Sequence, residues 1–435
     1  MILNISIKNF RSFKDEIVFS MVAESSKSKE NNIFLQPLAQ GESSVRLNNS
    51  ALLFGANASG KSNLFNALFS IVKFITNTKT EAGKPIQLYQ PFLFEENSKN
   101  LPVEFSLEFV NTDNIKYRYE LTIGEKSVLA EKLYYWPNNK RTLLFERVVP
   151  DDTNAFTHIG KPGQSLDFQQ IPVFQNQAVL SKFGQDIPNE ILTSVYIYFT
   201  NICIINISNS KMFGFFTNEI TEMFSKNQIL LNRMNALLTY ADTGIKAIMI
   251  QEKDEDSFVF PDEIGKDLKQ QLISKYKYKT VAIHNKFNDL KPAGEGELPF
   301  NEESSGTKQL FTIGGAILDA LDKGKTILID EMDIYLHTNI SKMLITLFQN
   351  KKINKKNAQL IVSTHDVNLL DRTLFRKDQI WFTEKDKYGV SSLYTLQDFT
   401  DVREDTPFDK WYMAGKFGAV PVIKSLETLF DNEEK

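Results

Sequence analysis

Residues 50–62 read Ser50-Ala51-Leu52-Leu53-Phe54-Gly55-Ala56-Asn57-Ala58-Ser59-Gly60-Lys61-Ser62, an apolar run followed by the complete pattern G-x-x-x-x-G-K-S. The apolar run predicts a strand, and apolar side chains at positions 64, 65, 68 and 69 predict one face of a helix that starts at Asn63. A strand, a glycine-rich loop and a helix in this order are typical of a phosphate-binding loop. A glycine-rich turn without function is the alternative, which this context disfavours.

The residues of this loop are suited to hold a nucleoside triphosphate. Glycines allow successive backbone N–H groups to surround a phosphate at the N-terminus of a helix. Lys61 would add a positive charge at the β- and γ-phosphates, and the Ser62 hydroxyl would ligate Mg²⁺. We therefore predict ATP and Mg²⁺ as ligands, with ATP contacted by Gly55, Asn57, Ser59, Gly60, Lys61, Ser62 and Asn63.

The composition is that of a globular chain without a strong charge bias. Its 435 residues suggest about two to three domains, and an apolar fraction of 42% suffices for packed cores. The 50 basic and 54 acidic residues give a net charge of −4. Any contact with nucleic acid is therefore expected to be local or to come from a partner.

The sequence gives no indication of export. Cys203 is the only cysteine, which excludes an internal disulfide and a cysteine-based zinc site and fits a reducing cytoplasm. Residues 1–8 alternate apolar and polar side chains as a strand does, unlike a signal peptide. The uncharged residues 191–210 are as long as a membrane span, but Thr, Ser and Asn side chains interrupt them and favour a buried strand or helix. We expect a cytoplasmic protein that does not enter a membrane.

A second apolar strand ends in two carboxylates. Thr326-Ile327-Leu328-Ile329 is followed directly by Asp330 and Glu331. Nucleotide hydrolysis needs a carboxylate near the metal and a group that polarises the attacking water. We predict that Asp330 holds Mg²⁺ through water and that Glu331 is the general base. An acidic helix start after a strand is the alternative.

A third apolar strand ends in a histidine. The helical pattern of residues 338–348 leads to Gln359-Leu360-Ile361-Val362-Ser363-Thr364, and His365 follows. A histidine that leaves a strand beside the metal strand could hydrogen-bond the γ-phosphate and sense its presence. We favour this function for His365 over a purely structural histidine.

Serine and glycine residues open another helix upstream of Asp330. Residues 303–310 read Glu-Ser-Ser-Gly-Thr-Lys-Gln-Leu, and apolar side chains follow at positions 310, 311, 313, 317 and 318. Ser304, Ser305 and Gly306 would form a second anion-binding helix N-terminus. An ordinary N-cap is the alternative. The place of this segment directly before the Asp330 strand favours the functional interpretation.

The order of these motifs resembles the ABC-type ATPase heads of the SMC, RecF and RecN kind. The opening Asn9-Phe10-Arg11-Ser12-Phe13 is also similar to the start of those heads. The resemblance implies an α/β fold, an ABC-type P-loop head in which helices flank a mixed β-sheet. It also implies that residues 304–307 are the signature motif, that Asp330 and Glu331 are the Walker B pair, and that His365 is the switch histidine.

The same resemblance implies partners and further site residues. The signature would cap the γ-phosphate bound by a second subunit, so ATP would join two heads face to face as a homodimer or a higher oligomer. Arg11 and Ser12 would lie near the nucleotide. Gln90, which follows the first helix, is the candidate Q-loop glutamine and a candidate Mg²⁺ ligand.

The motifs depart from those of transporters in two places. Ser304-Ser305-Gly306-Thr307 stands where transporters carry a Ser-Gly-Gly-Gln core, and residues 332–337 read Met-Asp-Ile-Tyr-Leu-His without Ser-Ala-Leu-Asp. The Leu-His pair and the C-terminal stretch from 378 to 421 are similar to OLD-like and abortive-infection ATPases of bacteria, of the AbiLi, RloA or AriA type. His337 would then take the D-loop role. The matching motifs cover residues 1–70 and 300–425.

Residues 62–329 exceed what a minimal nucleotide-binding core needs between its motifs, so we expect an inserted lobe. Alternation over 103–109 and 115–123 predicts a hairpin, and periodicity predicts helices over 218–225, 228–241 and 261–276. No heptad run persists, which favours a compact helical lid over a coiled-coil arm. The expected divisions are 1–100, the N-terminal part of the head; 101–185, a β-rich part; 186–290, the helical lid; and 291–435, the C-terminal part of the head.

Two charged stretches could bind a ligand: the first could contact nucleic acid or a partner, and the second could hold a second metal ion. Residues 266–279 carry five lysines with two tyrosines between them, and a solvated helix face is favoured over a nucleic-acid contact there. The acidic residues from 398 to 409 lack an apolar strand that presents paired carboxylates, and we interpret them as a solvated turn. If this system cuts nucleic acid, we expect a separate polypeptide to cut it.

These features favour an ATPase of a bacterial anti-phage defence system that dimerises on ATP and controls a separately encoded effector, such as a nuclease. The alternative is a DNA-repair head that clamps DNA when ATP joins two copies; the missing arms and the mildly acidic balance count against it. The variant signature disfavours the motor subunit of a membrane transporter. DNA affinity that requires ATP and falls with salt would distinguish the first two hypotheses.

Overall fold

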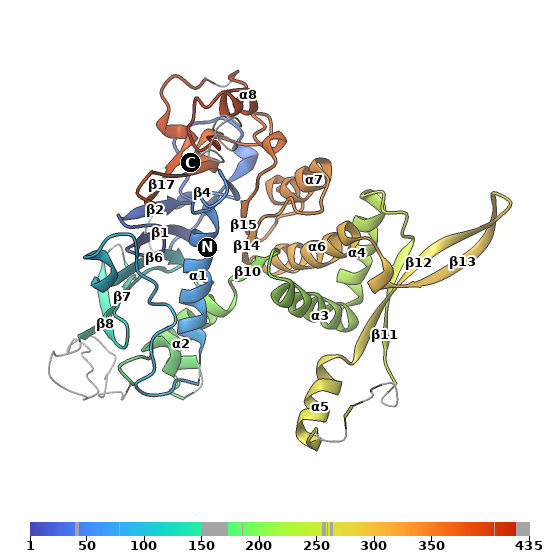
Figure 1. Cartoon of the computed structure of the whole chain (residues 1–435), viewed down its shortest axis with the longest axis horizontal. Coiled ribbons are helices and arrows are strands. Elements are labelled where there is room, and N and C mark those ends of the chain that lie inside the picture. The colour runs from blue at the N-terminus through green and yellow to red at the C-terminus, as the bar shows by residue number, and fades with distance from the viewer. Residues whose placement is uncertain are drawn as a thin grey trace, which may run out of the picture. The chain divides into compact units, whose positions relative to one another are not determined.

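The chain folds into two compact units. The computed structural model describes residues 1–39, 43–77, 79–138, 140–148, 173–184, 186–254, 258, 260–261, 264–403 and 405–422. The first unit comprises residues 1–201 and 363–435, and the second comprises residues 202–362. The chain therefore leaves the first unit once and returns to it. Figure 1 labels the helices and strands of both units.

An antiparallel sheet in the first unit has the order β2-β1-β6-β7-β8-β9. Its strands are β1 (Ile2–Lys8), β2 (Ile17–Ser20), β6 (Val103–Val110), β7 (Lys116–Ile123), β8 (Val128–Trp136) and β9 (Thr142–Val148). The predicted hairpin is confirmed, because β6 pairs with β7 and buries its apolar positions while Glu104 stays exposed. Since β6 also pairs with β1, this β-rich segment continues the sheet of the N-terminal strand.

The remaining strands of the first unit include β5, which leads into the phosphate loop, and a separate pair formed by β3 and β4. They are β3 (Ile33–Gln36), β4 (Val45–Asn48), β5 (Ser50–Gly55), β16 (Ile380–Lys385) and β17 (Ser391–Thr395). Every residue of β5 is buried, as its apolar run predicted, and β5 runs parallel to β16, which pairs antiparallel with β17. The helices are α1 (Lys61–Thr76), α2 (Glu190–Thr200) and α8 (Phe408–Met413). On the predicted apolar face of α1, Phe69 is 37% exposed, whereas Leu64 is fully buried.

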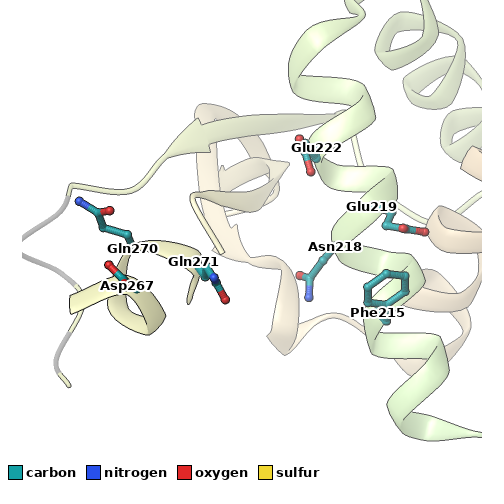
Figure 2. A pocket seen from close by; sticks show the side chains of 7 residues that line it. All are labelled: Phe215, Asn218, Glu219, Glu222, Asp267, Gln270 and Gln271. Atoms are coloured by element: carbon teal, nitrogen blue, oxygen red, sulfur yellow. The ribbon is translucent and has the colours of Figure 1, made fainter. Parts of the chain in front are cut away.

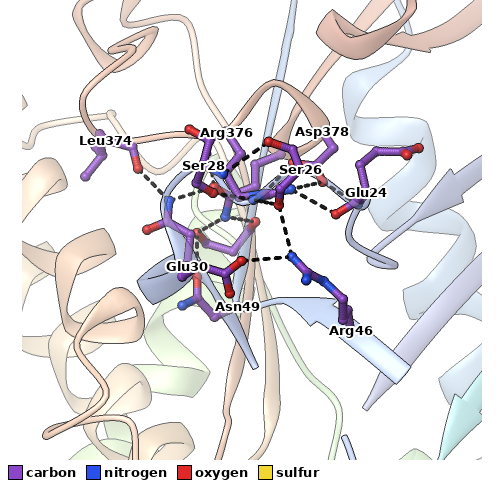
Figure 3. A network of polar contacts seen from close by, with 12 residues as sticks. Glu24, Ser26, Ser28, Glu30, Arg46, Asn49, Leu374, Arg376 and Asp378 are labelled. Atoms are coloured by element: carbon purple, nitrogen blue, oxygen red, sulfur yellow. Dashed lines mark hydrogen bonds and ion pairs between the residues drawn. The ribbon is translucent and has the colours of Figure 1, made fainter. Parts of the chain in front are cut away.

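The buried side chain of Arg376 joins the two stretches of chain that form the first unit (Figure 3). Arg376 is 3% exposed, and its Nε and Nη2 donate to the two carboxylate oxygens of Asp378 at 2.9 and 3.0 Å. The same guanidinium donates to the backbone carbonyls of Glu24, Ser26 and Ser28. Five N–H donors in a planar fork suit arginine to this arrangement.

In the second unit three parallel strands carry the Asp-Glu pair. They are β10 (Cys203–Asn206), β14 (Thr326–Asp330) and β15 (Gln359–Ser363), with β14 between the other two. The helices are α3 (Ser210–Lys226), α4 (Gln228–Tyr240), α5 (Lys266–Lys275), α6 (Ser305–Lys323) and α7 (Thr338–Gln349). The uncharged residues 191–210 thus form most of α2, then β10 and the start of α3. Among the helices in the described ranges, none is both long enough and apolar enough to cross a membrane.

The segment expected to be a helical lid, residues 186–290, also contributes strands to a three-stranded antiparallel sheet. Its strands are β11 (Ala247–Glu252), β12 (Tyr278–Asn288) and β13 (Lys291–Pro299). In Figure 1, β12 and β13 form a long ribbon that extends beyond the helices of this unit. Lysine, glycine and proline in β13 carry little strand signal, and pairing with β12 imposes the extended conformation on them.

Candidate functional site

The loop between β5 and α1 packs so closely against β16 and β17 that two of its glycines leave no room for a Cβ atom. Gly60 has a φ of 121°, and a Cβ at this position would lie 2.7 Å from the Oγ of Ser391. A Cβ on Gly55 would overlap the carbonyl oxygen of Thr383. Glycine is required at both positions because backbone and hydroxyl groups fill the space where another side chain would begin.

The end of this loop has the properties of a phosphate site. Gly60 precedes α1 without a side-chain cap, which leaves the helix N-terminus suited to an anion. Lys61 is 5% exposed, and its Nζ donates to the carbonyl oxygens of Gly55 at 2.8 Å and Ala56 at 3.1 Å. Asn57 lies exposed at the tip of the loop, and Ser62 is partly buried in the first turn of α1. These donors and this charge fit the phosphates of ATP.

Two residues that the sequence analysis missed hold the loop from β16 and β17. Ser391 Oγ donates to the carbonyl oxygen of Ser59 at 2.5 Å and lies 2.8 Å from Ser12 Oγ, within hydrogen-bond distance. Thr383 Oγ1 lies 2.6 Å from Ser59 Oγ. No local pattern distinguishes Thr383 or Ser391 in the sequence, because their proximity to the loop follows from the pairing of β5, β16 and β17.

Four predicted residues come together beside the loop. Arg11 Nε donates to Gln90 Oε1 at 2.7 Å, and Arg11 Nη1 donates to Asn63 Oδ1 at 3.3 Å. Asn63 Nδ2 in turn donates to Ser12 Oγ at 2.7 Å. Burial lowers the pKa of the Arg11 guanidinium, which remains charged at neutral pH. The structure thus brings Arg11, Ser12, Asn63 and Gln90 into one hydrogen-bonded network.

His365 leaves its strand close to the start of the phosphate loop. The backbone N–H of Thr364 donates to the carbonyl oxygen of Leu53 at 3.2 Å, and Leu53 lies two residues before Gly55 in β5. Thr364 is buried, whereas His365 is exposed. A ring at this position can reach solvent or a bound ligand.

The Asp-Glu pair lies at the end of β14 in the second unit. Asp330 is 2% exposed and accepts a hydrogen bond from Asn206 Nδ2 at 3.3 Å. Glu331 has a φ of 60°, an unusual conformation for a residue other than glycine, and its carboxylate accepts a hydrogen bond from Ser208 Oγ. Asn206 is the last residue of β10, the strand parallel to β14, and Ser208 lies two residues beyond it. Such backbone conformations are held in place at functional sites by the surrounding structure.

The serine-glycine segment forms the start of α6. Ser304 is the N-cap, and its Oγ accepts a hydrogen bond from the backbone N–H of Thr307 at 3.1 Å. The next residue, Ser305, is exposed. A Cβ on Gly306 would lie 2.8 Å from the carbonyl oxygen of Tyr335, so the first turn of α6 packs closely against the segment after Glu331.

His337 caps α7, which follows that segment. The Nδ1 of His337 accepts a hydrogen bond from the backbone N–H of Asn339 at 3.2 Å, and the ring is exposed. As the N-cap residue of α7, His337 holds its ring in place by this hydrogen bond.

Within the described ranges, no group of three or more His, Cys, Asp and Glu side chains could hold a metal ion. Glu404 of the acidic stretch 398–409 lies outside those ranges. Mg²⁺ in nucleotide sites is usually held by one or two protein groups together with the phosphates. The hydroxyl of Ser62 in the first unit and the carboxylate of Asp330 in the second unit are each of a kind that Mg²⁺ takes as a ligand, whereas the Gln90 amide oxygen already accepts from Arg11.

The chain is similar to solved structures of ATPase heads. The SMC head domain from Thermotoga maritima is 15% identical, with a TM-score of 0.42, over 91% of this chain and 98% of that chain. A second structure is the Smc head domain with an extended coiled coil, bound to the C-terminal domain of ScpA derived from Pyrococcus furiosus. It is 15% identical, with a TM-score of 0.41, over 91% of this chain and 96% of that chain. The recombination mediator protein RecF with ATP is 12% identical, with a TM-score of 0.36, over 90% of this chain and 97% of that chain.

No curated protein matches the chain. A family model described as "AAA domain, putative AbiEii toxin, Type IV TA system" matches residues 50–157 and 230–371, together more than half of the chain. The match includes the phosphate loop, the start of α6, the Asp-Glu pair and His365, and it confirms the predicted α/β P-loop ATPase head. The chain therefore belongs to this family of AAA-domain ATPases.

Proposed function

We propose that the chain is a nucleotide-dependent switch, in which ATP joins two copies head to head and the joined state controls a separately encoded effector. The start of α6 is the observation that carries this proposal. Its N-cap residue Ser304 is already engaged, whereas the hydroxyl of Ser305 is exposed at a helix N-terminus. An exposed N-terminal turn of this kind favours an anion. In the proposed dimer this anion is the γ-phosphate of ATP bound by the other copy.

The proposed hydrolytic site divides its roles between the two motif groups. Lys61 and the loop amides bind the phosphates, with Arg11, Ser12 and Asn63 supporting the loop. Ser62 and Asp330, with Gln90 as a further candidate, would hold Mg²⁺, which would neutralise phosphate charge. Glu331 accepts a proton from the attacking water, and His365 hydrogen-bonds the γ-phosphate. His337 would contact the site from the second copy.

The description of the family supports a role in defence. It names a toxin of an abortive-infection class and a toxin–antitoxin system. We propose an anti-phage system in which the ATP-bound dimer engages or releases an effector, such as a nuclease. A slow ATPase would suit this role, because the lifetime of the ATP state then sets the duration of the signal.

Mixing two inactive variants tests whether the site is shared between copies. Lys61→Ala removes the phosphate charge but leaves the signature, whereas Ser305→Arg blocks the signature but leaves the phosphate loop. If the site is composite, a mixture of both variants regains ATP turnover that neither variant has alone, because one intact site forms in each mixed dimer. A mixture as inactive as its components contradicts the shared site. The double variant Lys61→Ala/Ser305→Arg mixed with either single variant is the control and stays inactive.

DNA binding by the parent chain distinguishes a DNA clamp from a switch. DNA affinity that appears only with Mg-ATP and falls steeply with salt would favour the clamp. The switch predicts ATP-dependent dimers whose formation is independent of DNA.

A further inference from the structure

The second unit contains a pocket of about 1110 Å³ whose lining includes one residue of the proposed signature, Ser305. Its walls come from α3, from β12 and β13, from the first turn of α6 and from the segment after Glu331. Pockets of roughly 300 to 1,000 Å³ accommodate small organic ligands. The volume therefore suffices for a mononucleotide or a somewhat larger molecule.

The lining of this pocket combines rings with positive charges. Tyr278 and Phe300 provide aromatic faces, and Lys253, Lys279 and Lys308 provide ammonium groups; among the described lining residues, Glu297 carries the one carboxylate. Aromatic side chains stack on the bases of nucleotides, and lysine is a common phosphate ligand. The lining thus favours a ligand with an aromatic ring and an anionic group.

Gly214 keeps one wall of the pocket clear. It lies within α3, and a Cβ built on it would have nothing within 4 Å. Glycine within a helix is unfavourable, and no close packing explains it here. By contrast, Gly314 and Gly315 of α6 face side chains that a Cβ would meet within 3 Å. Open space over a helical glycine is what close approach of a ligand requires.

A second pocket near α3 has the opposite character. Figure 2 shows Glu219 and Glu222 of α3 and Asp267 of α5 among its lining side chains, together with Asn218, Gln270 and Gln271. Among the described residues that line it, none is basic and three are acidic, so this lining would repel a phosphate. The charges of the two linings therefore favour the first pocket as the site for an anionic ligand.

One residue of the first pocket contacts the predicted catalytic base. Ser208 lines the pocket, and its Oγ donates a hydrogen bond to the carboxylate of Glu331. Tyr335, which also lines the pocket, contacts Gly306 of the signature through its carbonyl oxygen. A ligand in the pocket would therefore touch residues that hold both Glu331 and the start of α6.

We propose that this pocket binds a nucleotide other than the ATP of the phosphate loop, and that its occupancy controls ATP turnover through Ser208. The control of turnover rests on the proposed role of Glu331, whereas the binding of a nucleotide does not. The pocket would make the switch responsive to the concentration of that nucleotide.

Equilibrium dialysis of the full-length Lys61→Ala chain tests the binding, because this background removes the phosphate-loop site. The probes are AMP, GMP, CMP and UMP. We expect at least one to bind saturably, one per chain, with a Kd below about 1 mM. Gly214→Leu should weaken this binding at least about tenfold by filling the pocket. Gly265→Leu is the matched control, since Gly265 also has open space around it but does not line the pocket.

Lys279→Glu provides an independent variant, because Lys279 is exposed and its replacement leaves the packing intact. It should also weaken binding. The proposal is overturned if none of the four probes binds, or if Gly214→Leu and Lys279→Glu both bind as the parent does. In the chain with Lys61 intact, the bound nucleotide should change the rate of ATP turnover, and Ser208→Ala should remove that response. Binding without any change of turnover would overturn the control by Ser208 while leaving ATP-dependent dimerisation to its own test.

Discussion

Ser391 Oγ donates a hydrogen bond to the carbonyl oxygen of Ser59 at 2.5 Å, although 332 residues separate the two along the chain. Through this contact the hairpin of β16 and β17 fixes the carbonyl that precedes Gly60. The conformation of the phosphate loop thus depends on a segment that the chain reaches only after it has completed the second unit. Folding of the first unit and formation of the nucleotide site are therefore coupled.

Gly60→Ala should abolish detectable ATP binding. The added Cβ would lie 2.7 Å from Ser391 Oγ at a φ of 121°, so the loop has to move. A loss of 1.4 kcal/mol already corresponds to about tenfold in affinity, and we expect a larger loss. Calorimetric titration with ATP measures it. Gly83→Ala is the control, because its Cβ meets nothing within 4 Å, and equal affinities for the two variants would contradict this view of the loop.

Ser208→Ala should raise the maximal rate of ATP hydrolysis by roughly two- to tenfold. The Ser208 hydroxyl donates to the Glu331 carboxylate, so it competes with the attacking water for the oxygens of the proposed base. The affinity for ATP should not change, because Ser208 does not belong to the phosphate loop. Steady-state kinetics separate the two quantities. A fall of the rate would show instead that Ser208 positions Glu331.

Arg376→Ala should lower the free energy of unfolding by about 3 to 5 kcal/mol. The change leaves the carboxylate of Asp378, 6% exposed, without its charge partner and frees three backbone carbonyls (Figure 3). Urea unfolding measures the effect. Lys8→Ala is the comparison, because the side chains of Lys8 and Glu104 are each 47% exposed and such pairs contribute less than about 1 kcal/mol. Similar losses for both variants would refute the structural role of Arg376.

Glu131 should make stability depend on pH. Its carboxylate is fully buried in β8 and accepts hydrogen bonds from Tyr119 Oη at 2.9 Å and from the backbone N–H of Val179. Burial raises the pKa of the carboxyl group, and Arg147 at 3.7 Å counteracts the rise only in part. When the pKa of a carboxyl group is higher in the folded chain than in the unfolded chain, the group stabilises the fold at a pH below its unfolded-state pKa of about 4.3. This stabilisation is lost as the pH rises through the pKa of the folded state.

Glu131→Gln keeps an acceptor at this position but cannot titrate. The stability advantage of the parent chain over this variant should therefore shrink as the pH rises from about 4 to about 7. The change is about 1.4 kcal/mol for each unit by which the folded pKa exceeds the unfolded one. Urea unfolding of both proteins at the two pH values measures it. An advantage that grows with pH would contradict the raised pKa.

The local elements of the site could be predicted from the sequence because each has its own periodic pattern. The buried run of β5, the amphipathic α1 and α6, and the strand before Asp330 are recognisable without tertiary information. Ser391, Thr383 and Ser208 could not be predicted, since each acts on a residue distant in the chain. The strands β12 and β13 were missed because pairing, more than propensity, makes β13 extended.

The mass of the Glu331→Gln chain in solution, with and without Mg-ATP, tests the central claim most directly. Removal of the base should trap the ATP state, so we expect twice the chain mass of 49.8 kDa with Mg-ATP and a single chain without nucleotide. Adding Lys61→Ala should abolish the dimer. A mass that does not respond to nucleotide would contradict the account.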